Sequence, residues 1–464
     1  MRPLGLLTLG LLLTGCAVGP DYSRPAIATP EAYRGATPNP STVVSTQLLG
    51  DQKWRDVFQD PVLQQLIRLA LQQNYDVRIA ASRVLQAQAQ LGITRADQFP
   101  TVSAGSQAFG EYNPKTSSAI PAYRVNAGEL DLSVVWNLDF WGKYRRQTEA
   151  ARANLLASQW GQRAVLSSVV SSVATAYFTL RELDWALDLA KSTLAARQNS
   201  LQLTNVLARN GSASALDVRQ SEQLVYTAAE TIPDLERQIS QEENSLSILL
   251  GDNPGPIPRG RPLTEQPDPP GVPVGLPSEL LERRPDIREA EETLVAANAQ
   301  IGVAKAALFP SISLTGLAGF ESNSLNNLFS HSQRVWNEAG SLTQPVFAGG
   351  ALRSGVRLAE AQEQQMLLTY RQTIMNAFQQ VSNSLVAYQK GREFREQQEL
   401  LTAAADDTDR LSKILYQHGG ASYLQVLTSE NNAFAAELNL AQAQLDERLA
   451  LVQLYNALGG GWEQ

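Results

Sequence analysis

The sequence predicts a membrane protein of the α+β class, in which long helices follow short pairs of strands and several copies complete one cylinder. Three observations predict this class. Apolar residues recur every seven residues over long stretches that contain no proline. Shorter segments alternate between apolar and polar residues, as strands do when one face meets lipid and the other meets water. This succession of patterns occurs twice along the chain.

The composition argues against an enzyme and against nucleic acid as a partner. Only 18% of the 464 residues are charged, whereas soluble proteins have roughly 25%. The formal net charge is −8, so the positive surface that phosphate binding requires is missing. One cysteine, Cys16, and two histidines, His331 and His418, leave little material for metal or general-base chemistry. We therefore expect no catalytic residue, no metal site and no cofactor.

The N-terminus reads as a targeting segment. Residues 1–15 place Arg2 before a short apolar run, which is typical of a secretory signal peptide. The run ends in Leu-Thr-Gly-Cys, which resembles a bacterial lipoprotein cleavage box, so Cys16 is expected to carry acyl and diacylglycerol lipid. The alternative is an ordinary signal peptide followed by an unpaired cysteine. Residues 16–61 are then the lipid anchor and an extended segment rich in Pro, Thr and Ser.

The rest of the chain consists of two repeats. Phe99-Pro100 recurs as Phe309-Pro310, an offset of 309 − 99 = 210. A Gly at 211 likewise recurs at 419, an offset of 208. We place the first repeat at 62–253 and the second at 277–464. Between them, residues 254–276 are rich in proline and are expected to form an extended linker.

Each repeat contains a long heptad pattern. In the first repeat, apolar residues recur every seven positions from Leu166 to Leu201. We predict helices at about 143–209 and 215–249 in the first repeat, and at about 351–417 and 423–458 in the second. A helix over 143–209 would be roughly 100 Å long at 1.5 Å per residue. Gly211 and Gly419 stand where each long helix would reverse direction.

The alternating segments predict strands. Leu130, Leu132 and Val134 alternate with Asp131 and Ser133, which suits a strand of a membrane barrel. The alternative is a hairpin of a soluble sheet. We predict strands at about 100–112 and 122–140, and equivalent strands at about 310–320 and 338–348.

Four strands cannot close a barrel, and open edges cannot face lipid. Two copies would give eight strands and an interior filled by side chains, whereas three copies would give twelve strands around a lumen wide enough for water. We favour three copies because a wet lumen suits the polar residues Asp131, Asn137 and Asp139. The expected fold is therefore a trimeric, twelve-stranded outer-membrane β-barrel continued by a periplasmic α-helical barrel. The sequence shows no evident apolar stretch of about 20 residues that would cross an inner membrane.

Five segments resemble one known family, the outer-membrane efflux lipoproteins of Gram-negative bacteria, related to TolC and OprM and of the NodT type. These segments are Gly15–Pro25, Trp136–Lys143, Gly275–Ile287, Ala307–Ser311 and Gln344–Gly350. The resemblance implies a homotrimer in the outer membrane that extends into the periplasm. It also implies two partners, a periplasmic adaptor protein and an inner-membrane transporter of the RND type.

The resemblance also implies a constriction at the periplasmic mouth. A leucine and, four residues later, an aspartate are typical there. Leu424 matches the leucine, but Thr428 stands in place of the aspartate and Asn431 in place of a basic residue. The sequence therefore predicts a gate made of Leu424, a neutral Thr428, Asn431 and the nearby Glu430.

Two helix-reversing turns resemble the family's adaptor-docking tips, whose small residues would let another helical hairpin approach. The alternative is that they are only helix caps. The residues are Asn210, Gly211, Ser212 and Ala213 in the first repeat and His418, Gly419, Gly420, Ala421 and Ser422 in the second.

The function expected from the sequence is a passive trimeric conduit that expels small molecules, such as drugs, delivered by a partner pump. One alternative is the outer-membrane component of a type I polypeptide secretion system. Another is a structural coiled-coil lipoprotein that links outer membrane and cell wall. The substrate and the identity of the pump and adaptor are not specified by the sequence.

Overall fold

A computed structural model describes residues 17–34, 48–114, 122–267 and 277–463. The predicted signal peptide 1–15 and the predicted lipid attachment site Cys16 lie outside the described residues. The chain forms two compact units. The first comprises residues up to Ala26, Arg83–Gln159 and Glu289–Arg371, and the second comprises Ile27–Ser82, Trp160–Arg288 and Gln372–Gln464. Each unit thus contains corresponding segments of both sequence repeats.

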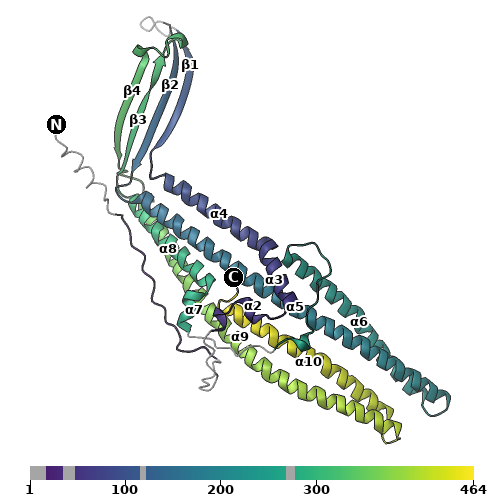
Figure 1. The fold of residues 1–464 in the computed structure, drawn as a ribbon. Coiled ribbons are helices and arrows are strands. Elements are labelled where there is room, and N and C mark those ends of the chain that lie inside the picture. The colour runs from purple at the N-terminus through teal and green to yellow at the C-terminus, as the bar shows by residue number, and fades with distance from the viewer. Residues whose placement is uncertain (1–16, 35–47, 115–121, 268–276, 464) are drawn as a thin grey trace. The chain divides into compact units, whose positions relative to one another are not determined.

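The first unit contains a four-stranded antiparallel sheet in the order β1-β2-β3-β4, drawn side by side in Figure 1. The strands are β1 Thr101–Asn113, β2 Tyr123–Leu138, β3 Ser311–Ser322 and β4 Arg334–Thr343. Pairing of β2 with β3 joins the two repeats, with Ser133 opposite Leu317. Within the described chain, β1 and β4 each keep one edge without a partner strand.

The sheet exposes its apolar side chains. On β2, Leu130, Leu132 and Val134 are exposed, whereas the intervening Asp131 and Ser133 are less so. A strand in a soluble protein would instead turn its apolar face to a core. This arrangement suits contact with lipid.

The predicted position of the fourth strand was wrong by about five residues. The prediction was 338–348, whereas β4 spans Arg334–Thr343. The strand ends before Pro345, which has no N–H to donate to a ladder, and the following Val346 and Phe347 are 96% and 91% exposed. It begins earlier because Arg334 still pairs with Phe320 of β3.

Four long helices follow the strands. They are α5 Lys143–Arg209, α6 Ala215–Leu250, α9 Ala351–Gln417 and α10 Tyr423–Ala457, each within one residue of the predicted bounds. In Figure 1, each 67-residue helix reverses into a shorter helix through a tight turn. One 18-residue window of α5 is apolar enough to cross a membrane by composition, contrary to our expectation, but 56% of it is buried within the chain.

Further helices precede each strand pair, and the sequence analysis did not predict them. They are α2 Trp54–Val57, α3 Pro61–Gln73, α4 Tyr75–Ala96, α7 Pro277–Arg283 and α8 Pro285–Ala306, with 3-10 turns η1 Leu49–Asp51, η2 Leu263–Glu265, η3 Leu325–Asn327 and η4 His331–Gln333. Helices α4 and α8 are offset by 285 − 75 = 210 residues, as are Phe99 and Phe309. Proline at the first position of α3 and α8 is a common helix start.

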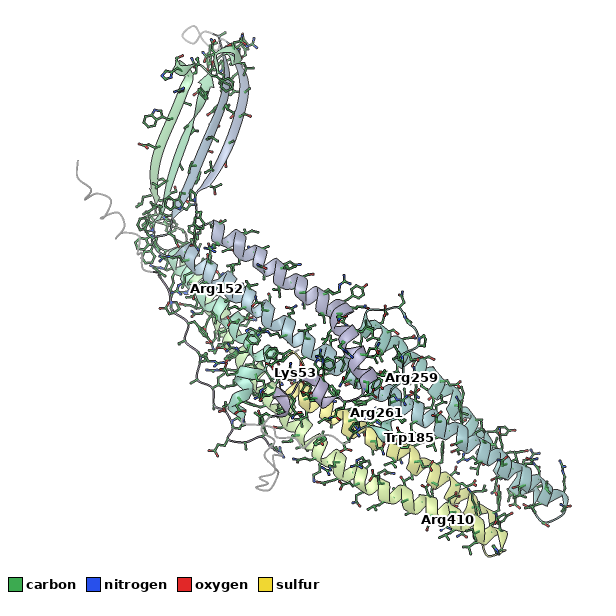
Figure 2. The ribbon with its side chains drawn as sticks, in the orientation of Figure 1. Lys53, Arg152, Trp185, Arg259, Arg261 and Arg410 are labelled. Carbon is green, nitrogen blue, oxygen red and sulfur yellow. The ribbon has the colours of Figure 1, made fainter. Side chains whose placement is uncertain are left out.

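The described part of the proline-rich segment after α6, residues 254–267, is extended apart from the 3-10 turn η2, and it packs within the second unit. Ile257 and Leu263 are buried. Arg259 forms ion pairs with Asp184 of α5 and Glu243 of α6. Figure 2 labels Arg259 and Arg261 on this segment.

Candidate functional site

The first helix-reversing turn is a glycine-capped helix end. Gly211 has φ 77°, a left-handed conformation that glycine adopts without steric cost. The Ser212 N–H donates to the Leu207 carbonyl oxygen (2.9 Å) and the Gly211 N–H to that of Ala208 (3.1 Å). These two bonds form a Schellman motif. Helix α6 then begins with a capping box between Ser214 and Asp217.

The second turn repeats this geometry. Gly419 has φ 75°, and the Gly420 N–H donates to the Leu415 carbonyl oxygen (2.8 Å). The His418 ring nitrogen Nδ1 lies 2.8 Å from the Ile414 carbonyl oxygen. Ser422 caps α10 by accepting a hydrogen bond from the Gln425 N–H.

Both turns present small, open surfaces. A Cβ added to either Gly211 or Gly419 would have no heavy atom within 4 Å. Asn210 and Ser212 are exposed, as are His418 and Gly420, while Ala213 and Ala421 are half-buried. The structure therefore shows two helix caps with space around them. Their contact with an adaptor stays a prediction.

Three of the four predicted gate residues share one face of α10. Leu424, Thr428 and Asn431 follow the i, i+4, i+7 spacing of a helix face, and all three are exposed. Leu424 is 60% exposed. The Thr428 hydroxyl donates to the Leu424 carbonyl oxygen (2.9 Å). Unlike the aspartate expected there, the threonine side chain is uncharged.

Glu430 lies elsewhere. Its Oε1 is 3.0 Å from Lys413 Nζ of α9, and its side chain is only 10% exposed. Burial lowers the pKa of Lys413, but hydrogen bonds with Asp409 and Glu430 outweigh that effect and raise it. Glu430 thus links the two helices of one hairpin and does not share the exposed face of Leu424.

A buried arginine that the sequence analysis missed binds one gate residue. Arg197 of α5 is 3% exposed. Its Nη2 donates to Asn431 Oδ1 (2.9 Å) and its Nη1 to the Leu224 carbonyl oxygen of α6 (3.0 Å), and its guanidinium lies 5.2 Å from the ring centre of Phe434. Burial lowers the pKa of Arg197, an effect that the charge of Glu430 opposes.

Tyr423 makes a second side-chain contact between the two helical hairpins, α5–α6 and α9–α10. Its hydroxyl is hydrogen-bonded to Ser221 of α6 and accepts from Thr204 Oγ1 of α5 at 3.4 Å. The sequence contains a pattern that indicates these contacts of Arg197 and Tyr423. The heptad position that is apolar at Leu183 and Ala190 becomes polar at Arg197 and Thr204.

The described residues contain no group of three or more His, Cys, Asp or Glu side chains placed to hold a metal ion. These features together define a protein of the outer-membrane channel class: an exposed apolar strand face, two long helical hairpins, and side-chain contacts that hold the start of α10.

Comparison with known proteins identifies the family. The model of the family described as outer membrane efflux protein matches residues 66–252 and 276–460. The chain therefore belongs to the outer membrane efflux protein family. The two matched regions correspond to the two halves of the chain.

Individual relatives cover nearly the whole chain. The cation efflux system protein CusC of Escherichia coli K12 is 34% identical over 464 residues, covering 99% of this chain and 100% of CusC. The probable efflux pump outer membrane protein TtgC of Pseudomonas putida is 36% identical over 469 residues, covering 99% and 95%.

Solved structures share the fold. The open state of the Neisseria gonorrhoeae MtrE outer membrane channel matches with a TM-score of 0.87 and 32% identity, covering 97% of this chain and 99% of MtrE. The outer-membrane channel OprN matches with a TM-score of 0.87 and 30% identity, covering 96% and 100%. The predicted fold class is confirmed. The protein is an outer-membrane component of an efflux system in a Gram-negative bacterium, and it extends into the periplasm.

Proposed function

We propose that three copies of this chain close one barrel, which carries small molecules passively through the outer membrane. The observation that supports this most strongly is a sheet with an exposed apolar face, in which β1 and β4 each have one edge without a partner strand among the described residues. Unpaired backbone groups in lipid cost several kcal/mol each. Three sheets of four strands remove all edges and leave a lumen for water.

The conduit would work with two partners, a periplasmic adaptor and an inner-membrane RND-type pump. The pump supplies the energy, because the sequence has no nucleotide-binding loop. The turns around Gly211 and Gly419 receive the adaptor. Their open glycines support this role, since another helix can approach their backbone closely. We also propose that the protein has no catalytic activity of its own.

Closure of the periplasmic mouth would depend on the start of α10. Arg197 and Tyr423 hold this segment against α5 and α6, so the mouth opens when these contacts break and α10 moves between two packings. With Thr428 and Asn431 uncharged, the narrowest ring is formed by Leu424 and neutral groups. It therefore selects little by charge.

The substrates proposed are small organic molecules, including drugs. The names of the relatives span cations, toluene and antibiotics, so the family fold does not select one substrate class. Three methionines and two histidines leave few soft ligands for relaying metal cations. Because all of these relatives are efflux proteins, efflux is favoured over polypeptide secretion.

We propose that Cys16 carries the lipid anchor. Its neighbour Ala17 lies against the junction of β2 and α5, since a Cβ on Gly142 would be 2.7 Å from the Ala17 Cα. The Val18 N–H donates to the Trp141 carbonyl oxygen at 3.0 Å, and Arg146 binds Asp21 at 2.7 Å. Labelled palmitate should enter the wild type and not Cys16→Ser. Equal labelling of both would contradict the anchor.

Planar-bilayer recording tests the conduit. Purified wild-type protein should conduct ions rarely, and Arg197→Ala should conduct roughly tenfold more often or better, because a charged hydrogen bond contributes about 1.5–3 kcal/mol to the closed packing. Arg237→Ala, which changes an exposed arginine of α6 paired with Asp234, serves as the matched control and should behave as wild type. Absence of conductance in all three proteins would favour a purely structural lipoprotein.

A further inference from the structure

Helices α6 and α9 each leave large apolar side chains exposed. On α6, Tyr226 and Ile248 are 67% and 62% exposed, and on α9 Met375 is 63% exposed. A helix normally buries its large apolar side chains against another element, because their contact with water costs free energy. Each of these two helices therefore has a face that the chain itself does not cover.

The sequence repeat gives each of these residues a counterpart. Helices α5 and α9 both span 67 residues and begin 351 − 143 = 208 residues apart. Helices α6 and α10 begin 423 − 215 = 208 residues apart. Position by position, α9 therefore corresponds to α5, and α6 corresponds to α10. A contact between α5 and α10 has its counterpart in a contact between α9 and α6.

Within one chain, α5 contacts α10 at two sites that lie 197 − 167 = 30 residues apart on α5. At the first site, the Ser167 hydroxyl donates to Asn456 Oδ1 (2.8 Å). At the second site, Arg197 donates to Asn431 Oδ1 (2.9 Å) and lies over the ring of Phe434. Ser167 and Arg197 are both buried.

The counterpart positions of the first site suit a contact between two copies. Adding 208 to Ser167 gives Met375 on α9. Subtracting 208 from Asn456 gives Ile248 on α6. Both counterparts are apolar and exposed. A hydrogen-bonded polar pair within the chain thus corresponds to an apolar pair, so the change on α9 is matched by the change on α6.

The counterpart of the second site contains a groove and an exposed ring. Arg197 corresponds to Ala405, whose side chain is much shorter. A groove of about 400 Å³ lies there, lined by uncharged residues that include Leu401, Ala404, Ala405, Ala435 and Ala436. Phe434 corresponds to Tyr226, the exposed aromatic residue of α6. An exposed ring therefore stands at the position that would face this groove.

The strands identify the partner as a second copy of this chain. In the trimeric barrel, β4 of one copy pairs with β1 of the next, because these are the two sheet edges that need a partner. This pairing is the counterpart of the pairing of β2 with β3 within a chain. The same conversion turns α5 into α9 and α10 into α6. The copy that places its β1 beside β4 therefore also brings its α6 to α9.

We propose that Tyr226 of one copy occupies the groove beside Ala405 of the next, with Ile248 of the first copy packed on Met375 of the second. The contact between copies is then apolar, whereas its counterpart within a chain contains the buried charge of Arg197. Aromatic side chains that enter pockets dominate the energy of many interfaces. The inference rests on the proposed function in one respect, the closure of one barrel by three copies.

Cross-linking of the purified full-length protein, without an adaptor or a pump, tests the contact. Ile248→Cys/Met375→Cys should react with a short bismaleimide to give a ladder of linked chains that stops at three. Each single variant should stay unlinked. The matched control is Leu216→Cys/Met375→Cys. Leu216 is a similarly exposed apolar residue of α6, but it lies 248 − 216 = 32 residues, roughly 48 Å, from Ile248, so this pair should stay unlinked.

The temperature at which the trimer dissociates in detergent measures the contribution of Tyr226. Tyr226→Ala should lower this temperature by several degrees, because three grooves lose the ring that fills them. Tyr226→Phe keeps the ring and should behave as wild type. A side chain that stayed in water would give a different result. Tyr226→Ala would then leave the temperature unchanged or raise it, because alanine has the higher helix propensity.

Two results separate this inference from the proposed function. Suppose that the protein forms trimers and conducts ions, but Ile248→Cys/Met375→Cys stays unlinked or Tyr226→Ala leaves the dissociation temperature unchanged. That result would overturn the contact between α6 and α9, assign the exposed faces to another partner and leave the conduit intact. Protein that neither forms trimers nor conducts ions would refute the conduit, and this inference with it.

Discussion

The buried carboxylate of Asp60 forms hydrogen bonds with three parts of the second unit, namely α3, α5 and the proline-rich segment. It is 1% exposed, and it caps α3 by accepting from the Val62 N–H (2.8 Å). Its Oδ2 accepts from the Tyr177 hydroxyl of α5 (2.8 Å), and from Arg261 N–H (3.0 Å) and Gln266 (2.7 Å) of the proline-rich segment. Burial acts to raise the pKa of Asp60, but these hydrogen bonds outweigh it and hold the pKa below its ordinary value.

At the residue scale, Tyr177→Phe should destabilise the protein by about 1.5–3 kcal/mol, the usual contribution of a hydrogen bond to a charged group. Asp60→Ala should cost about 3 kcal/mol or more, because several buried donors lose their acceptor. Denaturant unfolding in detergent measures both.

The contribution of Asp60 to stability should also depend on pH. Because the pKa of Asp60 is lowered in the folded protein, its contribution to the free energy of unfolding is present above the ordinary aspartate range and is lost as the pH falls below it.

Tyr226→Phe provides the control, because Tyr226 is 67% exposed on α6 and an exposed substitution normally changes stability by less than about 0.5 kcal/mol. A loss for Tyr226→Phe as large as that for Tyr177→Phe would show that the Asp60 contacts are not what stabilises this region.

Residue contacts were only partly predictable from the sequence. The spacing of Leu424, Thr428 and Asn431 was enough to place them on one helix face. The partner of Asn431 was not predictable in the same way, because Arg197 is 234 residues from Asn431 and contacts across such a separation leave no local periodicity. The interrupted heptad at Arg197 was the available signal.

At the scale of elements, the long helices were predicted well because their heptads are continuous and their ends carry glycine or serine caps. Strand β4 was misplaced because the apolar residues Val346 and Phe347 were included in it, although Pro345 prevents pairing there. Helices α4 and α8 were missed because their apolar faces are weakly defined, and exposed apolar residues such as Ile79 and Ile93 interrupt the usual pattern.

The turns at the helix ends allow a test of adaptor docking. Ala213→Trp together with Ala421→Trp should abolish drug resistance in cells that depend on this channel, because each indole would occupy space that the turn leaves open. The backbone at these positions stays unchanged, so bilayer conductance should persist. Ala213→Ser with Ala421→Ser is the matched control and should keep resistance. Full resistance in the double Trp variant would mean that these turns serve only as helix caps.

At the scale of the whole molecule, the sequence repeats and the compact units divide the chain differently. The repeats follow one another along the sequence, but each unit gathers corresponding segments from both. Repeats can be read from similarity, whereas this regrouping depends on pairings such as that of β2 with β3. Closure of the barrel by other copies likewise cannot be read from one chain, except through the unpaired edges of its sheet.

The internal repeat predicts the register between copies. The pairs Thr101–Val135 and Ser311–Thr343 relate β1 to β3 by 311 − 101 = 210 and β2 to β4 by 343 − 135 = 208. Between copies, β4 of one chain would pair with β1 of the next in the way that β2 pairs with β3, where Ser133 lies opposite Leu317. The offsets convert Ser133 of β2 into Ser341 of β4 (133 + 208) and Leu317 of β3 into Gln107 of β1 (317 − 210). Ser341 of one copy is therefore expected opposite Gln107 of the next. Directly opposite residues in antiparallel strands have Cα atoms about 4.5–5.5 Å apart, within disulfide range.

Oxidative cross-linking of Gln107→Cys/Ser341→Cys in the outer membrane tests the closed barrel most directly. The account predicts a ladder of one, two and three linked chains that stops at three. Each single variant should stay unlinked, as should Gln107→Cys/Val335→Cys, whose second site lies six residues, roughly 20 Å, away from Ser341. A ladder that stops at two or continues beyond three, or a chain that stays unlinked, would contradict it.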